Sequence, residues 1–267
     1  VGIINEIFVE NGARVREGEP ILNIDDTQSV AQLEIANSQY LSFKALETRL
    51  IAERDGLSEL VFPSELSING PRAIKEINSQ TEIFEARRTA LQTATAVLEQ
   101  RIEQLQSQIE GLKGLQLSKE ILAASYKEEL KDVRELLDQG FSDKNRLRDL
   151  ERNVAQLNGE AADLIANIAG TEVGIGESRL QIIQQENDFQ NQVVTELSQV
   201  QTDINDISER IFALEDIVSR TIVRAPESGI VNGMQVHTVG GVITPGMRIV
   251  DIVPEKDDLV VEAKVSP

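Results

Sequence analysis

Apolar residues recur at alternating three- and four-residue spacing through the second half of the sequence. Two runs show the spacing most clearly: Leu147, Leu150, Val154, Leu157, Ala161, Leu164 and Ile168, then Leu197, Val200, Ile204, Ile207, Ile211, Leu214 and Val218. Such spacing places the apolar side chains on one stripe of an α-helix, as in a coiled coil. We therefore predict a single helix over about 143–219 that packs against a second helix.

That second helix is predicted over about 72–138. It follows a Gly-Pro stop in which Pro71 suits the first helical turn, and it ends at LLDQGFSDKN. Within this ending, Gly140 suits the left-handed position after a helix and Ser142 suits the N-cap of the next helix. At about 1.5 Å per residue the two helices measure roughly 100 and 110 Å. Because these lengths match, we predict an antiparallel hairpin with its tip near 139–142.

A shorter helix is predicted over about 27–55, where Leu33, Ala36, Tyr40, Phe43 and Leu50 form one apolar stripe. Residues 57–70 interrupt the helical pattern, and an extended segment of that length is just able to return the chain to the base of the hairpin. We therefore expect this helix to pack along the base of the two longer ones.

Glycines occur inside both long helices. Pairing residues symmetrically about a turn near Gly140 places Gly111 opposite Gly170. Each interior glycine weakens its helix by up to about 1 kcal/mol relative to alanine. Two readings stay open: a bend or close approach of neighbouring helices at this height, or simple tolerance in a long hairpin.

The composition argues against a thick globular core and against most chemical functions. Aromatic residues make up 3% of the chain, Trp and Cys are absent, and the net charge is −19. The charge disfavours nucleic acid as a partner, and the lack of cysteine excludes disulfides and thiolate metal sites. His237 is the single histidine and is assigned a structural role, while the carboxylates are spread along helix faces beside Lys and Arg. We therefore expect no catalytic residue, no cofactor, no metal and no enzyme.

The ends of the sequence have the character of strands. The chain opens on Val1 within one strand-like segment and stops at VVEAKVSP within another, so we expect a fragment of a longer protein. No stretch reaches the roughly 18 to 20 apolar residues that a membrane span needs, and no signal peptide is found.

Two glycine-punctuated segments of β type flank the predicted helices and repeat one another. Aligning Gly2 with Gly229 pairs Ile3 with Ile230, Ile4 with Val231, Asn5 with Asn232 and Val9 with Val236. After one inserted residue, Gly12 pairs with Gly240, Val15 with Ile243, Gly18 with Gly246, Ile21 with Ile249 and Ile24 with Ile252. Such a repeat predicts two similar four-strand halves that bury their apolar faces only against each other.

These paired half-motifs resemble the lipoyl or biotinyl carrier fold, a β-sandwich of two quasi-symmetric halves. We therefore predict an α+β fold in which a long antiparallel coiled-coil hairpin with an extra basal helix is inserted between the halves of a lipoyl-like β-sandwich. The predicted parts are residues 1–25, the first half; 26–220, the helical domain; 221–255, the second half; and 256–267, the start of a β-barrel domain.

A lipoyl-like module split by a helical hairpin resembles the periplasmic adaptor, or membrane fusion protein, family. IVRAPESGIV (222–231) is similar to that family's entry into the second half-motif, and VHTVGGVITPGMRIVDIVPEKDDLVVEAKV (236–265) is similar to its hemolysin-type branch, which serves type I secretion. The resemblance covers nearly the whole chain.

The resemblance implies a periplasmic protein of a Gram-negative bacterium, anchored in the inner membrane by a helix preceding Val1. Implied partners are an inner-membrane ABC transporter, a TolC-like outer-membrane channel, a secreted protein substrate and further copies of the chain, typically in a hexamer. The implied channel-docking residues lie at the hairpin tip: Arg134, Leu137, Gly140, Phe141, Ser142 and Leu147. The tip pattern Arg-x3-Leu-x6-Ser of many adaptors is not matched in register here.

Three alternatives remain. A drug-efflux adaptor is the nearest, although its hairpin is usually shorter. A lipoyl or biotinyl carrier requires a modifiable lysine between the half-motifs, where no Asp-Lys-Ala or Met-Lys-Met sequence stands. A purely structural coiled coil does not require the two flanking segments to associate.

Overall fold

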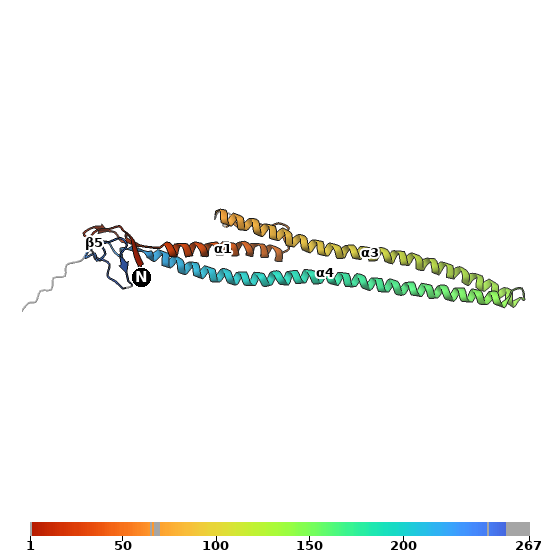
Figure 1. Ribbon diagram of the computed structural model, residues 1–267. Coiled ribbons are helices and arrows are strands. Elements are labelled where there is room, and N and C mark those ends of the chain that lie inside the picture. The colour runs from red at the N-terminus through yellow and green to blue at the C-terminus, as the bar shows by residue number, and fades with distance from the viewer. Residues whose placement is uncertain (1, 65, 67–69, 245, 255–267) are drawn as a thin grey trace, which may run out of the picture. The chain divides into compact units, whose positions relative to one another are not determined.

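Three helices carry most of the protein. The computed structural model describes residues 2–64, 66, 70–244 and 246–254. The helices are α1 (Thr27–Arg54), α3 (Pro71–Asp138) and α4 (Lys144–Thr221) (Figure 1). Their ends lie within two residues of the bounds expected from the sequence.

Local side-chain and backbone chemistry sets the helix ends. Before α1, the carboxylate of Asp25 accepts hydrogen bonds from the amide (3.1 Å) and the hydroxyl (2.6 Å) of Thr27. The hydroxyl bond, followed by the amide bond, lowers the pKa of Asp25. After α1, Gly56 adopts a φ of 65°, a left-handed conformation that ends the helix. Pro71 is the first residue of α3, as predicted, since its missing amide proton costs nothing there.

Among the described residues, seven strands form two antiparallel sheets, three from the first flanking segment and four from the second. They are β1 (Gly2–Ile7), β2 (Arg14–Val15), β3 (Pro20–Ile24), β4 (Ile222–Arg224), β5 (Gly229–Asn232), β6 (Val242–Ile243) and β7 (Asp251–Pro254). One sheet has the order β4-β3-β1-β6 and the other β2-β5-β7. Each sheet therefore contains strands from both flanking segments, and we call the two sheets together the β-module.

The core of the β-module is filled by both halves. One cluster joins Val9, Val15 and Ile21 of the first segment to Ala225, Val231 and Met234 of the second. A second cluster joins Ile4 to Val236 and Ile243. Because the halves bury their apolar faces against each other, the predicted α+β fold, with a hairpin inserted between two halves of one sandwich, is confirmed.

Residue contacts divide the chain into two compact units. The first contains residues 1–49, 61–80 and 197–267, and the second contains residues 50–60 and 81–196. In the first unit, Ala36 of α1 packs with Ile207 and Leu214 of α4, and Tyr40 and Phe43 extend this cluster. These are residues of the stripe predicted for the basal helix.

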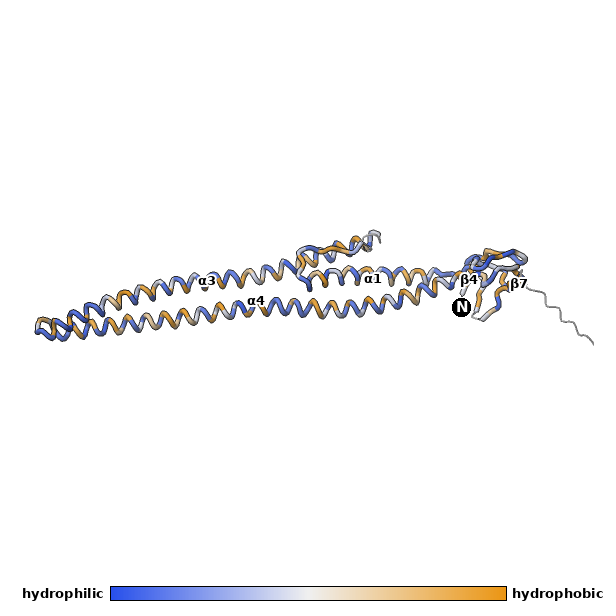
Figure 2. Tube along the Cα trace, turned by 180° about the vertical axis from the view of Figure 1, so that it is seen from behind, coloured by the Kyte–Doolittle hydropathy of each residue, from blue (hydrophilic) through white to orange (hydrophobic). Residues whose placement is uncertain are grey.

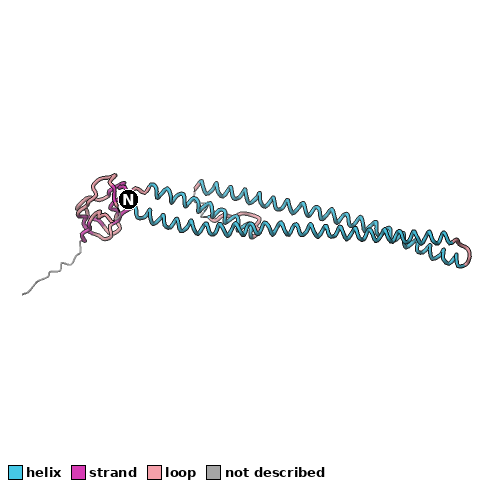
Figure 3. Tube along the Cα trace, turned by 60° about the horizontal axis from the view of Figure 1, so that its bottom comes forward, coloured by secondary structure: helices cyan, strands magenta, loops and turns pink. Residues whose placement is uncertain are grey.

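In the second unit, α3 and α4 run side by side to a short turn (Figures 1 and 3). Hydrophobic and hydrophilic residues alternate along both helices (Figure 2). Ile109 of α3 packs with Ile168 and Ile175 of α4, and Ile102, Leu105 and Leu112 flank this cluster. Each helix thus covers the apolar stripe of the other.

The interior glycines of the hairpin do not mark a close approach of helices. A Cβ added to Gly111 or Gly170 meets no atom within 4 Å. Gly174 alone among the interior glycines of this region has a neighbour, Leu105 Cδ1, at an ordinary 3.6 Å. The close-approach reading is therefore wrong, since Gly111 and Gly170 face open space and Gly174 makes only an ordinary contact.

No helix in the described part of the chain is long and apolar enough to cross a membrane. The β-barrel start expected at 256–267 lies outside the described residues.

Candidate functional site

The hairpin tip is closed by a glycine-dependent turn. Gly140 has a φ of 82°, the left-handed conformation predicted for it. Its amide donates to the carbonyl of Leu137 (2.9 Å), and the amide of Phe141 donates to the carbonyl of Leu136 (2.8 Å). This pair of bonds is the Schellman arrangement, which satisfies the last carbonyl groups of α3 and turns the chain away from its axis.

Asp143, and not Ser142, caps α4. The helix begins at Lys144, and Asp143 Oδ1 accepts the amide of Asn145 at 3.1 Å. The prediction that Ser142 is the N-cap was wrong by one residue. Both residue types are good N-caps, so the sequence offered two adjacent candidates and only the backbone path decides between them.

The turn exposes an aromatic side chain to solvent. Phe141 is 79% exposed, and Leu136, on the last turn of α3, is 45% exposed. Leu137 and Leu147 are half-buried, as is Ser142. The structure therefore brings five of the six predicted tip residues to the turn or its first flanking helical turns, with Phe141 as the most exposed apolar group.

Ion pairs join the two helices below this apolar group. Arg134 of α3 pairs with Glu151 of α4 at 2.9 Å, and Arg146 of α4 pairs with Glu129 of α3 at 2.8 Å. Arg134, the sixth predicted tip residue, thus bridges the two helices. All four side chains are well exposed, so these pairs contribute little stability, but they place charged groups, here called the charged rim, on the helices next to the apolar turn.

Farther from the turn, Lys119 Nζ lies 2.7 Å from Glu160 Oε2. The hydrogen bond from Lys119 holds the pKa of the Glu160 carboxyl below its usual value, and a second bond from Gln156 acts in the same direction. This pair joins α3 to α4 within the second unit.

The six half-motif glycines occupy matching places in the β-module. Gly12 and Gly240 have φ values of 89° and 87°, and Gly18 and Gly246 have values of 80° and 84°. Left-handed conformations of this kind strongly favour glycine. The two remaining glycines are set by space: a Cβ on Gly2 would overlap Ile24, and a Cβ on Gly229 would overlap the carbonyl oxygen of Val253.

His237 is exposed beside a cavity of about 430 Å³ that Phe8, Met234 and Val239 also line. Among the described residues, no group of three or more His, Cys, Asp or Glu side chains could hold a metal ion.

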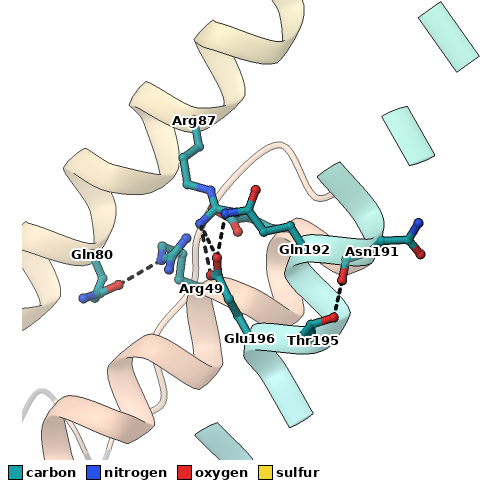
Figure 4. A network of polar contacts seen from close by, with 8 residues as sticks. Arg49, Gln80, Arg87, Asn191, Gln192, Thr195 and Glu196 are labelled. Carbon is teal, nitrogen blue, oxygen red and sulfur yellow. Dashed lines mark hydrogen bonds and ion pairs between the residues drawn. The ribbon is translucent and has the colours of Figure 1, made fainter. Parts of the chain in front are cut away.

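A buried ionic cluster in the second unit was missed from the sequence. Arg87 of α3 lies 3.4 Å from Glu53 of α1 and 3.1 Å from Glu196 of α4, and its guanidinium stands 5.3 Å above the ring of Phe189. Arg87 and Glu196 point toward one another in Figure 4. The side chain of Glu53 is only 3% exposed. We call Glu53, Arg87 and Glu196 the ionic lock, because one cation joins three helices.

Within the first unit, a second buried arginine follows the same logic. Arg49 of α1 is 4% exposed and donates to Gln80 of α3 at 2.9 Å (Figure 4). The sequence signal for both clusters is a charged or amide residue at a helix position that faces a neighbouring helix, which an apolar periodicity does not register.

Comparison with known proteins places these features in a family. Residues 29–217 match the family described as AprE, long alpha-helical hairpin. Over 99% of its length the chain is 35% identical to the type I secretion system membrane fusion protein PrsE of Rhizobium meliloti and 28% identical to the alkaline protease secretion protein AprE of Pseudomonas aeruginosa. The chain spans 61% and 62% of the lengths of these two relatives.

A solved structure shares the whole arrangement. The soluble domain of LipC, a membrane fusion protein of a type I secretion system, is 31% identical to this chain and superposes with a TM-score of 0.91, covering 95% of this chain and 96% of that one. Since the family match extends over more than half of the chain, the protein belongs to the AprE family of long α-helical hairpins, the membrane fusion proteins of type I secretion that the sequence resemblance indicated.

Proposed function

We propose that this chain is the hairpin and β-module part of a periplasmic adaptor in a type I secretion system. The observation that carries the proposal is the likeness to the soluble domain of LipC over nearly the full length of both chains. The names of PrsE and AprE support protein secretion over drug efflux as the process served. The role is one of connection and requires no catalytic group.

In this proposal the hairpin tip docks on a TolC-like outer-membrane channel. An exposed Phe141 beside Leu136 supplies apolar contact, and the charged rim formed by Arg134, Glu151, Arg146 and Glu129 supplies orientation. Apolar centres within polar rims are the usual anatomy of protein interfaces. Arg134, Leu137, Gly140, Phe141, Ser142 and Leu147 are the proposed docking residues.

The remaining partners are proposed from the family role. They are an inner-membrane ABC transporter, a secreted protein as cargo and five further copies of the chain in a hexameric ring. In the full-length protein we place the adaptor in the periplasm of a Gram-negative bacterium, with an anchor in the inner membrane.

Crosslinking from the tip tests the docking proposal. The chain has no cysteine, so the substitution Phe141→Cys gives this part of the protein a single reactive site. Phe212→Cys is a matched control, because Phe212 is an aromatic residue of α4 that is 72% exposed. With the cognate transporter and channel expressed, we expect the Phe141→Cys variant, and not the Phe212→Cys variant, to crosslink to the channel.

Two outcomes of the crosslinking experiment contradict the docking proposal. If secretion proceeds and neither variant crosslinks to the channel, or if both crosslink equally, tip docking is wrong.

A further inference from the structure

The β-module has an internal twofold symmetry that extends to single residue pairs. In β1 and β3, Ile4 stands opposite Ile24; in β5 and β7, Val231 stands opposite Ile252. The sequence repeat aligns Ile4 with Val231 and Ile24 with Ile252, so these pairs are equivalent. Strands β1, β2 and β3 thus correspond to β5, β6 and β7.

Pairings between the halves obey the same symmetry. Val15 of β2 lies opposite Gly229, and its equivalent Ile243 of β6 lies opposite Gly2. The amide of Gly12 donates to the carbonyl of Val231 at 2.8 Å, and the equivalent amide of Gly240 donates to the carbonyl of Ile4 at 2.8 Å. Two such matches at equal distance show that the halves are built to one pattern.

One strand has no equivalent among the described residues. Strand β4 covers the outer edge of β3, with Arg224 opposite Pro20, Val223 opposite Leu22 and Ile222 opposite Asn23. The equivalent of β3 is β7, and in the described part of the chain only β5 pairs with β7. The second sheet is therefore one strand narrower than the first on this edge.

Residues of β3 are more deeply buried than the equivalent residues next to β7, as expected when only β3 is covered by a further strand. Ile21 and Leu22 of β3 are 1% and 0% exposed. Their equivalents Ile249 and Val250, which lead into β7, are only half-buried. Full burial of apolar side chains of this size stabilises a folded protein. A strand beside β7 can therefore bury Ile249 and Val250 further, as β4 does for the equivalent residues of β3.

Backbone groups next to β7 repeat the asymmetry. Gly18 donates its amide to the carbonyl of Ala225, just after β4, and Ala225 donates to the carbonyl of Glu19, both at 2.9 Å. The equivalents of Gly18 and Glu19 are Gly246 and Met247. Among the described residues, the amide of Gly246 and the carbonyl of Met247 have no hydrogen-bond partner.

We propose that the outer edge of β7 binds an extended strand, antiparallel to β7, which the residues leading into Gly2 supply in a longer form of this protein. Strand β4 ends five positions before Gly229, so its equivalent ends five positions before Gly2. The strand then occupies the positions four to six places before residue 1. A small residue, equivalent to the buried Ala225, stands three places before residue 1.

The occupant follows from the symmetry and from the lengths of the relatives, of which this chain spans 61% and 62%. Edge strands with unpaired backbone groups readily accept a further strand. The proposal concerns the β-module alone, and it holds whether or not the hairpin tip docks on a channel.

A chain extended by a copy of β4 tests the edge. The sequence Ile-Val-Arg-Ala-Pro-Glu, copied from residues 222–227, is added directly before Val1 of the 267-residue chain. Hydrogen exchange by mass spectrometry then follows peptides that cover 247–254. We expect exchange there to slow by roughly tenfold or more relative to the unextended chain, and peptides that cover 19–24 to remain unchanged.

A matched control replaces the added Ile-Val-Arg by three prolines, which removes the amide donors of the strand while keeping its length. This control is expected to leave exchange at 247–254 as fast as in the unextended chain. Equal exchange with and without the true extension overturns the proposal. So does protection that is already complete in the unextended chain, or that rises with protein concentration, since another segment or a second copy then covers the edge.

Discussion

At the scale of single residues, Gly229 is fixed by the space around it. A Cβ at this position would overlap the carbonyl oxygen of Val253 and lie 2.8 Å from Ile252 Cγ2. We predict that Gly229→Ala lowers the free energy of unfolding of the β-module by about 1–3 kcal/mol, because β7 must move to admit the methyl group. Hydrogen exchange at β5 and β7 measures the change.

Gly170→Ala is the control for this substitution. Gly170 lies inside α4 with open space where its Cβ would stand, so alanine is expected to stabilise the helix by about 0.5–1 kcal/mol. If both substitutions destabilise the protein equally, the contact argument for Gly229 fails.

Among single charged residues, those that are buried have the largest effect on the free energy of unfolding. Removing one member of a buried pair costs about 3–5 kcal/mol at most. Arg87 is partly exposed, so we predict that Arg87→Met, which removes a cation facing the buried Glu53 carboxylate, costs about 2 kcal/mol. Arg146→Met breaks the exposed pair with Glu129 and is expected to cost well under 1 kcal/mol.

Denaturant unfolding of both variants measures this difference. If Arg87→Met lowers the free energy of unfolding as little as Arg146→Met does, the ionic lock contributes to the specificity of helix packing and not to stability.

At the scale of elements, the sequence predicts what apolar spacing controls. The long helices follow from an apolar stripe that continues through Leu197 and Val218. The turn follows from Gly140, whose left-handed φ is tolerated well only by glycine. The ionic lock escapes such reasoning, because Glu53, Arg87 and Glu196 look like surface charges until three helices are assembled. Ser142 and Asp143 were indistinguishable as caps for the same reason: neighbouring residues with equal chemistry are separated only by the path of the backbone.

The short strands mark a second limit at this scale. Strands β2 and β6 contain two residues each, too few for an alternating pattern to be visible. The repeat of Gly12 and Gly18 in Gly240 and Gly246 nevertheless identified these two segments as equivalent, because it aligned Val15 with Ile243. The roles of the glycines within the hairpin were harder to predict, since no contact in the structure explains Gly111 or Gly170.

At the scale of the whole molecule, the β-module requires both ends of the chain. Strand β3 pairs with β4 on one side, and β1 pairs with β6. We predict that a chain ending at Thr221 loses protection from hydrogen exchange throughout residues 2–24, because a half without its partner cannot bury Ile4 or Ile21. Residues 50–60 and 81–196 form their own compact unit, and the helical residues 81–138 and 144–196 within it are expected to stay protected.

Exchange measured by mass spectrometry on both chains distinguishes the outcomes. Persistent protection at residues 2–24 in the shortened chain means that the first half folds alone and that the module is not truly shared.

The sharing of each sheet between the two flanking segments also sets an order of events during synthesis. Strand β1 leaves the ribosome roughly 240 residues before its partner β6, an interval of about 12–48 s at ordinary elongation rates. During that interval the first three strands have exposed edges, which favour aggregation. The local contacts of the helices form much faster, so the helices fold while β1, β2 and β3 still lack their partners β6, β5 and β4 in the second segment. The newly synthesised first segment is therefore a natural substrate for a chaperone. The need for a chaperone ends only when the last strand has been synthesised.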